Sequence, residues 1–287
     1  MPTTFEPLAN ASTFRRIAAA MWRQPSDPSI YGSMDLDVTG TLRFMERYRQ
    51  QTGRRLTVTH VVARAVAQAF ARFPDLNAKV RFGGRLERRR TVDLFVSVAT
   101  DGGKDLSGAR VEDAADKDLG DIITELESRA LDIRKGKDRN YEKSRGTFRT
   151  LPWWLARPLM WLTDVLTNEL HLHLPTWGLP RDPFGTAVIT NVGPFGIDTA
   201  FAPFLPIARC PMLLLVTEVK PRAWVAGGRL EVRPVLRLCA TFDHRIIDGF
   251  SAGRIASVVR DYVENPGMLL DQEDVPVTQR QTARAQA

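Results

Sequence analysis

The sequence predicts a single mixed α/β domain, and two observations carry this prediction. Stretches with an apolar residue at every second position, typical of strands, alternate along the chain with stretches whose apolar residues recur at helical spacing. With 287 residues, 44% of them hydrophobic, the chain can bury one large core or two modest ones. We find no internal repeat, so a repeat architecture is not expected.

The first half of the chain predicts helices and strands in turn. Ser12 and Thr13 can cap a short first helix, and Pro74 ends a strongly apolar one. The expected elements are a helix over 14–23, a strand over 30–38, helices over about 41–51 and 59–73, a strand over 91–100 and an amphipathic helix over 117–135.

Strands dominate the second half, from Ala187 to Phe242. In the last of them, even-numbered residues from Leu236 to Phe242 are apolar and face one way, with Arg237, Cys239 and Thr241 opposite. Ser251 can cap a final helix. Its apolar residues keep helical spacing, and Asn265 and Pro266 stop it.

Charge and cysteine content narrow the function classes. The net charge is +7, but the basic residues are scattered and accompany no nucleic-acid-binding motif, so no nucleic-acid partner is expected. The two cysteines, Cys210 and Cys239, form no spaced framework, which favours a reducing compartment. We expect neither a signal segment nor a bilayer span, so the expected location is cytoplasmic and a membrane partner is not expected.

The segment TFDHRIIDGF, residues 241–250, carries the most reactive-looking side chain. His244 lies beside Asp243 and four residues before Asp248, on the connection between a predicted strand and a predicted helix. Such connections hold reactive groups on a rigid scaffold. An imidazole near its usual pKa of about 6.5 suits proton transfer at neutral pH.

These residues resemble the catalytic domain of the dihydrolipoyl acyltransferases of 2-oxoacid dehydrogenase complexes. The resemblance rests on DHRIIDG and on other stretches in the same order, covering most of residues 13–270. These stretches are RRIAAAMWRQ, MDLDVT, RFPDLNAKV, VSVAT, the helix 117–135, ITNVGPFG and DYVENPGMLL. The family implies an α/β fold of the chloramphenicol acetyltransferase type, a two-layer sandwich with a mixed β-sheet.

The resemblance also implies site roles. His244 is the expected general base, and the Thr190 hydroxyl the expected donor to the oxyanion, although an ordinary strand threonine is the alternative. Asp248 is expected to pair with an arginine, Arg15 or Arg16, and to hold the His244 loop. Asn191 and Gly249 are expected to support the site, the glycine by giving the turn backbone freedom.

A metal site is the rival interpretation. His171 and His173, with His244 and a carboxylate, offer ligand types that bind zinc. Histidines two positions apart diverge on a helix, and no Cys or Glu is spaced to complete the set. We therefore expect no metal.

Three departures from the family pattern shape the expected organisation. We expect an N-terminal tail over 1–12, the catalytic domain over 13–270 and a polar tail over 271–287, so a lipoyl group would come from another protein. GGKDLSGARV replaces a Gly-Leu-x-x-Pro stretch of the substrate channel. Residues 138–183, called the insert below, are Trp-rich; a core or oligomer-contact helix is favoured over a lid for an acyl chain or a membrane-surface helix.

The sequence thus predicts a homotrimeric acyltransferase with active sites between subunits. It would move an acyl group between coenzyme A and a dihydrolipoyl group supplied in trans, with a lipoyl-domain protein and dehydrogenase subunits as possible partners. Two alternatives stay open. One is a coenzyme A-dependent acyltransferase acting on a small-molecule alcohol or amine, and the other is a non-catalytic scaffold of a dehydrogenase complex.

Overall fold

A computed structural model describes residues 27–100, 105–135, 152–173, 182–205 and 207–270. The expected first helix, 14–23, lies outside these residues. The helices are α2 (Thr39–Thr52), α3 (Val58–Arg72), α4 (Leu119–Arg134), α6 (Trp153–Asp164) and α7 (Gly249–Glu264). The strands are β1 (Ser29–Asp37), β2 (Ala78–Val80), β3 (Leu86–Arg88), β4 (Leu94–Thr100), β5 (Asp105–Val111), β6 (Ala187–Asn191), β7 (Met212–Ala226) and β8 (Arg229–Asp243).

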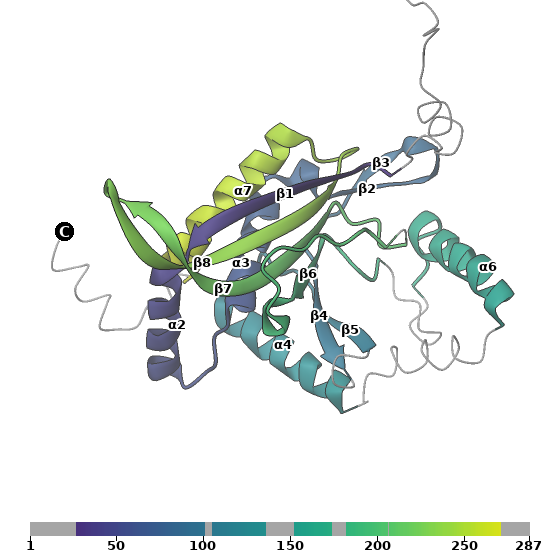
Figure 1. Ribbon diagram of the computed structural model, residues 1–287. Coiled ribbons are helices and arrows are strands. Elements are labelled where there is room, and N and C mark those ends of the chain that lie inside the picture. Colours follow the sequence, from purple (N-terminus) through teal and green to yellow (C-terminus); the bar gives the residue numbers. More distant parts are fainter. Residues whose placement is uncertain (1–26, 101–104, 136–151, 174–181, 206, 271–287) are drawn as a thin grey trace, which may run out of the picture.

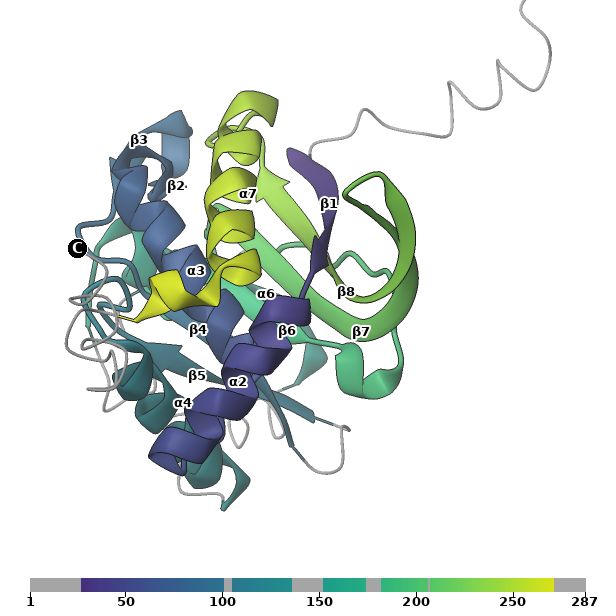
Figure 2. The same cartoon turned by 90° about the vertical axis from the view of Figure 1, so that its left-hand side faces the viewer.

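Six of these strands form one mixed sheet in the order β1-β8-β7-β6-β4-β5. Strands β4, β6 and β7 run parallel to their neighbours in that group, and the other pairs are antiparallel. Helices α2, α3, α4 and α7 cover one face of the sheet, as Figures 1 and 2 show. The α/β sandwich with a mixed sheet is therefore confirmed. The short β2–β3 hairpin, which sequence periodicity did not indicate, forms a separate two-stranded sheet.

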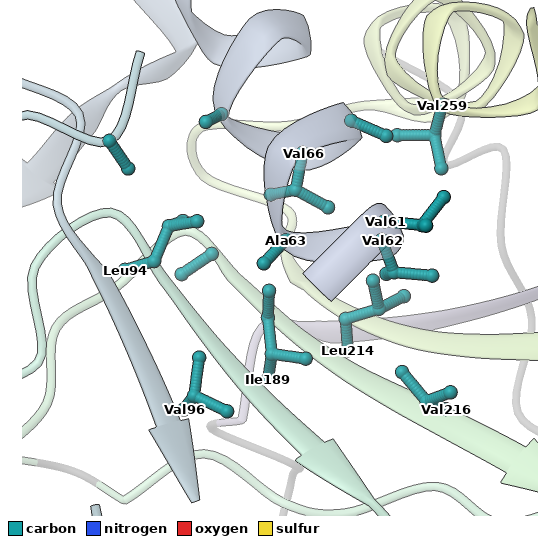
Figure 3. Packing of buried hydrophobic residues seen from close by; sticks show 14 of the residues in the cluster. Val61, Val62, Ala63, Val66, Leu94, Val96, Ile189, Leu214, Val216 and Val259 are labelled. Atoms are coloured by element: carbon teal, nitrogen blue, oxygen red, sulfur yellow. The ribbon is translucent and has the colours of Figure 1, made fainter. Parts of the chain in front are cut away.

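Helix α3 lies at the centre of the main core. Its side chains, among them Val62 and Val66, pack against the sheet residues Ile189 and Leu214, and Val259 of α7 closes the cluster (Figure 3). Ten of the fifteen α3 residues are buried, which explains why this segment is apolar around most of its circumference. The confirmed helix therefore anchors both α7 and the middle of the sheet.

The opposite face of the sheet buries a second, smaller cluster. Cys239 and Leu215 belong to it, together with Cys210 and three partly buried aromatic residues, Phe95, Phe184 and Phe204. Thr241 is also fully buried, and its hydroxyl donates to the carbonyl of Ala202 at 2.8 Å. The predicted alternation in β8 is confirmed, but both faces of the strand are covered.

The start of the final helix differs from the prediction. Asp248, not Ser251, is the N-cap residue, because its carboxylate accepts a 2.8 Å hydrogen bond from the Ser251 amide. Gly249 is the first helical residue and its φ is not positive, so the turn does not require a glycine there. An added Cβ at Gly249 would meet no atom within 4 Å.

Gly108, on the edge strand β5, has a packing role within the stretch GGKDLSGARV. A Cβ at this position would lie 2.1 Å from the Phe95 ring, which is itself packed 5.0 Å from the ring of Phe184. Only glycine leaves room for this aromatic pair. In this stretch, which departs from the family pattern, Gly108 lets the Phe95 ring lie over strand β5.

We expect Gly108→Ala to lower the free energy of unfolding by about 1–3 kcal/mol, because the Phe95 ring must leave its packed position. The control is Gly253→Ala on the exposed side of α7, where an added Cβ meets no atom within 4 Å. That change should raise stability by up to about 1 kcal/mol, since glycine disfavours helix interiors. Denaturant unfolding compares the two, and equal stability of Gly108→Ala and the parent chain would contradict the packing argument.

Candidate active site

The loop after β8 holds His244 in a fixed position. Asp243, the last residue of β8, is buried and accepts two hydrogen bonds from the Arg245 guanidinium, at 2.6 and 2.9 Å. The carbonyl of Asp243 also accepts the amides of Ile246 and Ile247, both at 2.9 Å. Ile247 is fully buried in the main core. The turn is therefore clamped on both sides of the histidine.

The imidazole of His244 is oriented by the same turn. Its backbone amide donates to the Pro28 carbonyl at 2.9 Å, and its Nδ1 lies 3.2 Å from the carbonyl oxygen of Ile247. A carbonyl only accepts, so this contact requires the proton on Nδ1. Nε2 is then the basic nitrogen of the neutral ring, and the side chain is exposed. This is the tautomer that a general base needs.

Thr190 and Asn191 end β6 in a rigid turn. The side-chain Nδ2 of Asn191 donates to Thr59 Oγ1 at the start of α3, at 2.9 Å. Its Oδ1 accepts a hydrogen bond from the backbone amide of Gly193, also at 2.9 Å. A Cβ on Gly193 would lie 2.9 Å from the Thr217 carbonyl, so this position needs glycine. Thr190 is half-buried, and among the described residues its hydroxyl has no hydrogen-bond partner. The hydroxyl is therefore available to a ligand.

A single chain does not bring Thr190 and His244 together. Thr190 is level with Leu215 on β7, which is level with Cys239 on β8, and His244 follows Cys239 by five residues. At about 3.3 Å per residue, this places the two side chains roughly 17 Å apart along the strands, with two strand spacings between them. His244, Asp248 and Gly249 share one loop, whereas Thr190 and Asn191 lie toward the other end of the sheet.

Comparison with known proteins decides the family. The model of the 2-oxoacid dehydrogenases acyltransferase (catalytic domain) family matches residues 4–150 and 184–270. The chain belongs to this family. The lipoamide acyltransferase component of the branched-chain alpha-keto acid dehydrogenase complex of Bacillus subtilis is 22% identical over 256 residues, 88% of this chain and 50% of that protein. The chain thus spans about half the length of that relative.

Solved structures share the fold. A probable dihydrolipoamide acetyltransferase from Listeria monocytogenes aligns with a TM-score of 0.63 and 20% identity, over 93% of this chain and 97% of that one. The dihydrolipoamide acetyltransferase of Azotobacter vinelandii aligns with a TM-score of 0.63 and 19% identity, over 85% and 84% of the two chains. The acyltransferase fold is therefore established independently of the site motif.

Asp248 caps α7 and is exposed. The hydrogen bonds from the amide and the side chain of Ser251 lower the pKa of Asp248, and the nearby His244 adds to this effect. No arginine of the described residues pairs with Asp248. Arg15 and Arg16 lie outside the described residues, so the expected ion pair remains a prediction. The spacing of Asp248 and Ser251, three positions apart, is the sequence signal for the cap.

Two substitutions of Asp248 distinguish its role as a helix cap from its expected role in an ion pair. Asn is also a good cap, so Asp248→Asn should keep most of the stability if capping is the main role, whereas Asp248→Ala should lower the melting temperature. The lowered folded-state pKa means that the carboxylate stabilises the fold above about pH 4, a contribution lost as the pH falls through the folded pKa. The difference between parent and Ala variant should therefore shrink once the pH falls below the lowered folded pKa, as thermal melts at pH 7 and at about pH 2 would show. An Asn variant as unstable as the Ala variant would instead indicate a charge partner.

Within its described residues, the insert forms helix α6. Helix α6 continues into a π-helical turn, Val165–Glu169, and stands on the far side of the sheet from α2 and α3 (Figures 1 and 2). Trp154 and Trp161 are each 61% exposed, so the core-helix interpretation is wrong for a single chain. The oligomer-contact and lid interpretations remain predictions. Trp177 lies outside the described residues, and the side chain of Trp153 is not described.

The end of α6 and the π-helical turn after it are held by two arginines. Arg209 pairs with both Asp164 and Glu169, and Arg81 Nε lies 3.0 Å from Glu169 Oε2. Burial alone would raise the pKa of Glu169, but hydrogen bonds from Arg209, the Phe82 amide and Arg81 outweigh it and lower the pKa to about 2. The insert is thus tied to the β2–β3 hairpin by a charge network that persists at neutral pH.

The described residues contain no cluster of three or more His, Cys, Asp or Glu side chains that could hold a metal ion. His171 instead lies 2.9 Å from Glu87 through its Nε2, far along the chain from His244. In the described part of the chain, no helix is long and apolar enough to cross a bilayer.

Proposed function

We propose that this protein transfers an acyl group between the thiols of coenzyme A and a dihydrolipoyl group supplied in trans, with His244 as general base. The observation that carries the proposal is the exposed His244 ring, held through Nδ1 by the Ile247 carbonyl so that Nε2 is basic. Family membership and the names of the relatives, which are lipoamide and dihydrolipoyl acyltransferases, support the substrate class.

The chemistry follows from these groups. Nε2 takes the proton of the attacking thiol, and the resulting thiolate adds to the thioester carbonyl. The Thr190 hydroxyl donates a hydrogen bond to the oxyanion of the tetrahedral intermediate. When the intermediate collapses, the other thiolate leaves and takes the proton back from the imidazolium. Charge and protons balance, so the step needs neither a metal nor a redox partner.

Each site is proposed to lie between two chains of a homotrimer. The separation of Thr190 and His244 within one chain supports this, because one thioester carbon cannot lie within reach of both side chains. In a ring with threefold symmetry, the Thr190 end of one chain faces the His244 end of the next, giving three equal sites. The Azotobacter study concerns a serine, a histidine and an asparagine in catalysis, in that order along the chain. The third follows the histidine by four positions, as Asp248 follows His244 here.

Partners and location follow from the same proposal. A lipoyl-domain protein would present the dihydrolipoyl group, and 2-oxoacid dehydrogenase subunits would supply the acyl group to it. Both cysteines are free and buried, which supports a reducing, cytoplasmic location. The site as proposed takes coenzyme A as a substrate or product and holds no metal.

The test is transfer from a panel of acyl-coenzyme A thioesters to three acceptors: free dihydrolipoamide, a separate lipoyl domain, and small alcohols or amines. We expect thiol acceptors to be acylated and the lipoyl domain to be the best of them. Acylation of alcohols or amines alone would favour the small-molecule enzyme. No transfer to any acceptor by the intact trimer would favour the scaffold.

A further inference from the structure

A cavity of about 710 Å³ lies beside the β2–β3 hairpin, away from the Thr190 turn. It is lined by the hairpin, by the residues just before β4, by the end of β5 and by the insert. Five of the lining residues are Lys or Arg and two are His, against four carboxylates. A volume of this size falls in the range of small-molecule sites. Its two histidines, His171 and His173, come from a stretch that the family model does not match.

Lys79 is a buried cation that lines this cavity. The residue is only 5% exposed, yet its Nζ makes only long contacts: 3.5 Å to the Asn168 carbonyl, 3.5 Å to His171 Nδ1 and 4.0 Å to Glu87 Oε2. Desolvation lowers the pKa of Lys79, and Asp182 opposes this only in part. A buried ammonium without a short ion pair gains when an anion binds.

Three of the four carboxylates around the cavity are already engaged, and the fourth, Glu112, is exposed and lies 3.8 Å from Arg110. Asp182 accepts two hydrogen bonds from Arg89, at 2.6 and 2.9 Å, and Asp93 lies 2.6 Å from Arg110. Glu87 lies 3.0 Å from Arg81 and 2.9 Å from His171. By contrast Arg90 is exposed at the cavity and forms no ion pair within the described residues.

Backbone strain gathers at the same place. His171 and Asp182 line the cavity with φ values of 53° and 48°, and Asp113, with φ of 49°, follows the lining residue Glu112. Such left-handed conformations are disfavoured for residues other than glycine and collect at ligand sites. Ion pairs hold His171 and Asp182, and the Asp113 amide donates to Asp93 Oδ1 at 3.0 Å.

We propose that this cavity binds a phosphate group, with Lys79 and Arg90 as its principal cationic contacts. A lysine and an arginine from separate segments suit an anion with several acceptor oxygens better than a single carboxylate. The volume exceeds that of the bare ion and leaves room for an organic remainder. The phosphate could belong to coenzyme A or to a separate phosphorylated molecule, and binding experiments distinguish the two.

The test measures binding of inorganic phosphate to the full-length chain by calorimetry, at constant ionic strength set with sodium chloride. We expect Lys79→Met and Arg90→Gln to weaken phosphate binding at least about tenfold. The matched control is Arg85→Gln, an exposed arginine of the same hairpin that does not line the cavity, which should bind as the parent does. Arg90 is exposed, so its variant keeps the test decisive if the Lys79 variant fails to fold.

A second set of binding measurements identifies the molecule that carries the phosphate. If coenzyme A places a phosphate here, dephospho-coenzyme A should bind more weakly, and Arg90→Gln should abolish that difference. If coenzyme A binding is the same in parent and Arg90→Gln while inorganic phosphate binding is weakened, the site serves a separate phosphorylated ligand. Absence of phosphate binding, or equal binding by parent, Arg90→Gln and Arg85→Gln, would overturn the proposal. Neither set measures acyl transfer, so failure here leaves the proposed function untouched.

Discussion

His244→Ala is expected to lower the rate of acyl transfer by about 10²–10⁴-fold while leaving the fold intact. The ring is exposed, and its described side-chain contact is a single 3.2 Å approach to the Ile247 carbonyl, so its loss removes little packing. The turn itself is held by Asp243, Arg245 and the buried Ile247, none of which changes. The variant should therefore lose its catalytic activity and keep its fold.

The measurement compares initial rates and melting temperatures of parent and variant. Activity of the variant within a few-fold of the parent, at unchanged melting temperature, would remove His244 from the mechanism.

A mixture of His244→Ala and Thr190→Val chains is expected to recover about a quarter of the parent activity, although each variant alone is nearly inactive. Removing an oxyanion donor costs about 10²–10³-fold, and Val keeps the shape of Thr. In a randomly mixed trimer with two-chain sites, an intact Thr190 can meet an intact His244 across some interfaces. Sites built within one chain would contain one defect each, whatever the mixture.

Co-expression of the two variants at equal levels gives the mixed trimers, and light scattering coupled to size-exclusion chromatography checks their mass. Thr190→Ser, which keeps the hydroxyl, serves as the control and should retain much of the activity. Recovery no greater than the sum of the two separate variants would contradict the two-chain site. Equal rates for the Ser and Val variants would reduce Thr190 to a packing role.

Periodicity alone predicted most of the regular structure. Helix α3 and strand β8 have strong repeats, so their existence and approximate bounds followed from the sequence. The β2–β3 hairpin was missed because strands of three residues are too short to show a period. The cap of α7 was misplaced because two good cap residues, Asp248 and Ser251, lie one turn apart, and only the hydrogen bond between them shows which one caps.

The candidate site was predictable in its residues but not in its arrangement. The motif around His244 identified the base, yet its tautomer depends on the Ile247 carbonyl, which sequence spacing does not place. The Thr59 contact that holds Asn191 spans 132 positions and could not be found from local pattern. The distance between Thr190 and His244 depends on the order of strands in the sheet, which only the fold supplies.

The burial of both cysteines under the second face of the sheet has a chemical consequence of its own. Acyl thioesters react spontaneously with exposed thiolates, so an enzyme that handles them risks acylating itself. Cys210 is 2% exposed, and burial raises the pKa of its thiol to about 12, while Cys239 is fully enclosed. Neither sulfur can compete with the acceptor thiol for the acyl group. On the proposed function, thioester chemistry takes place at the exposed His244, while both sulfurs of the chain stay buried.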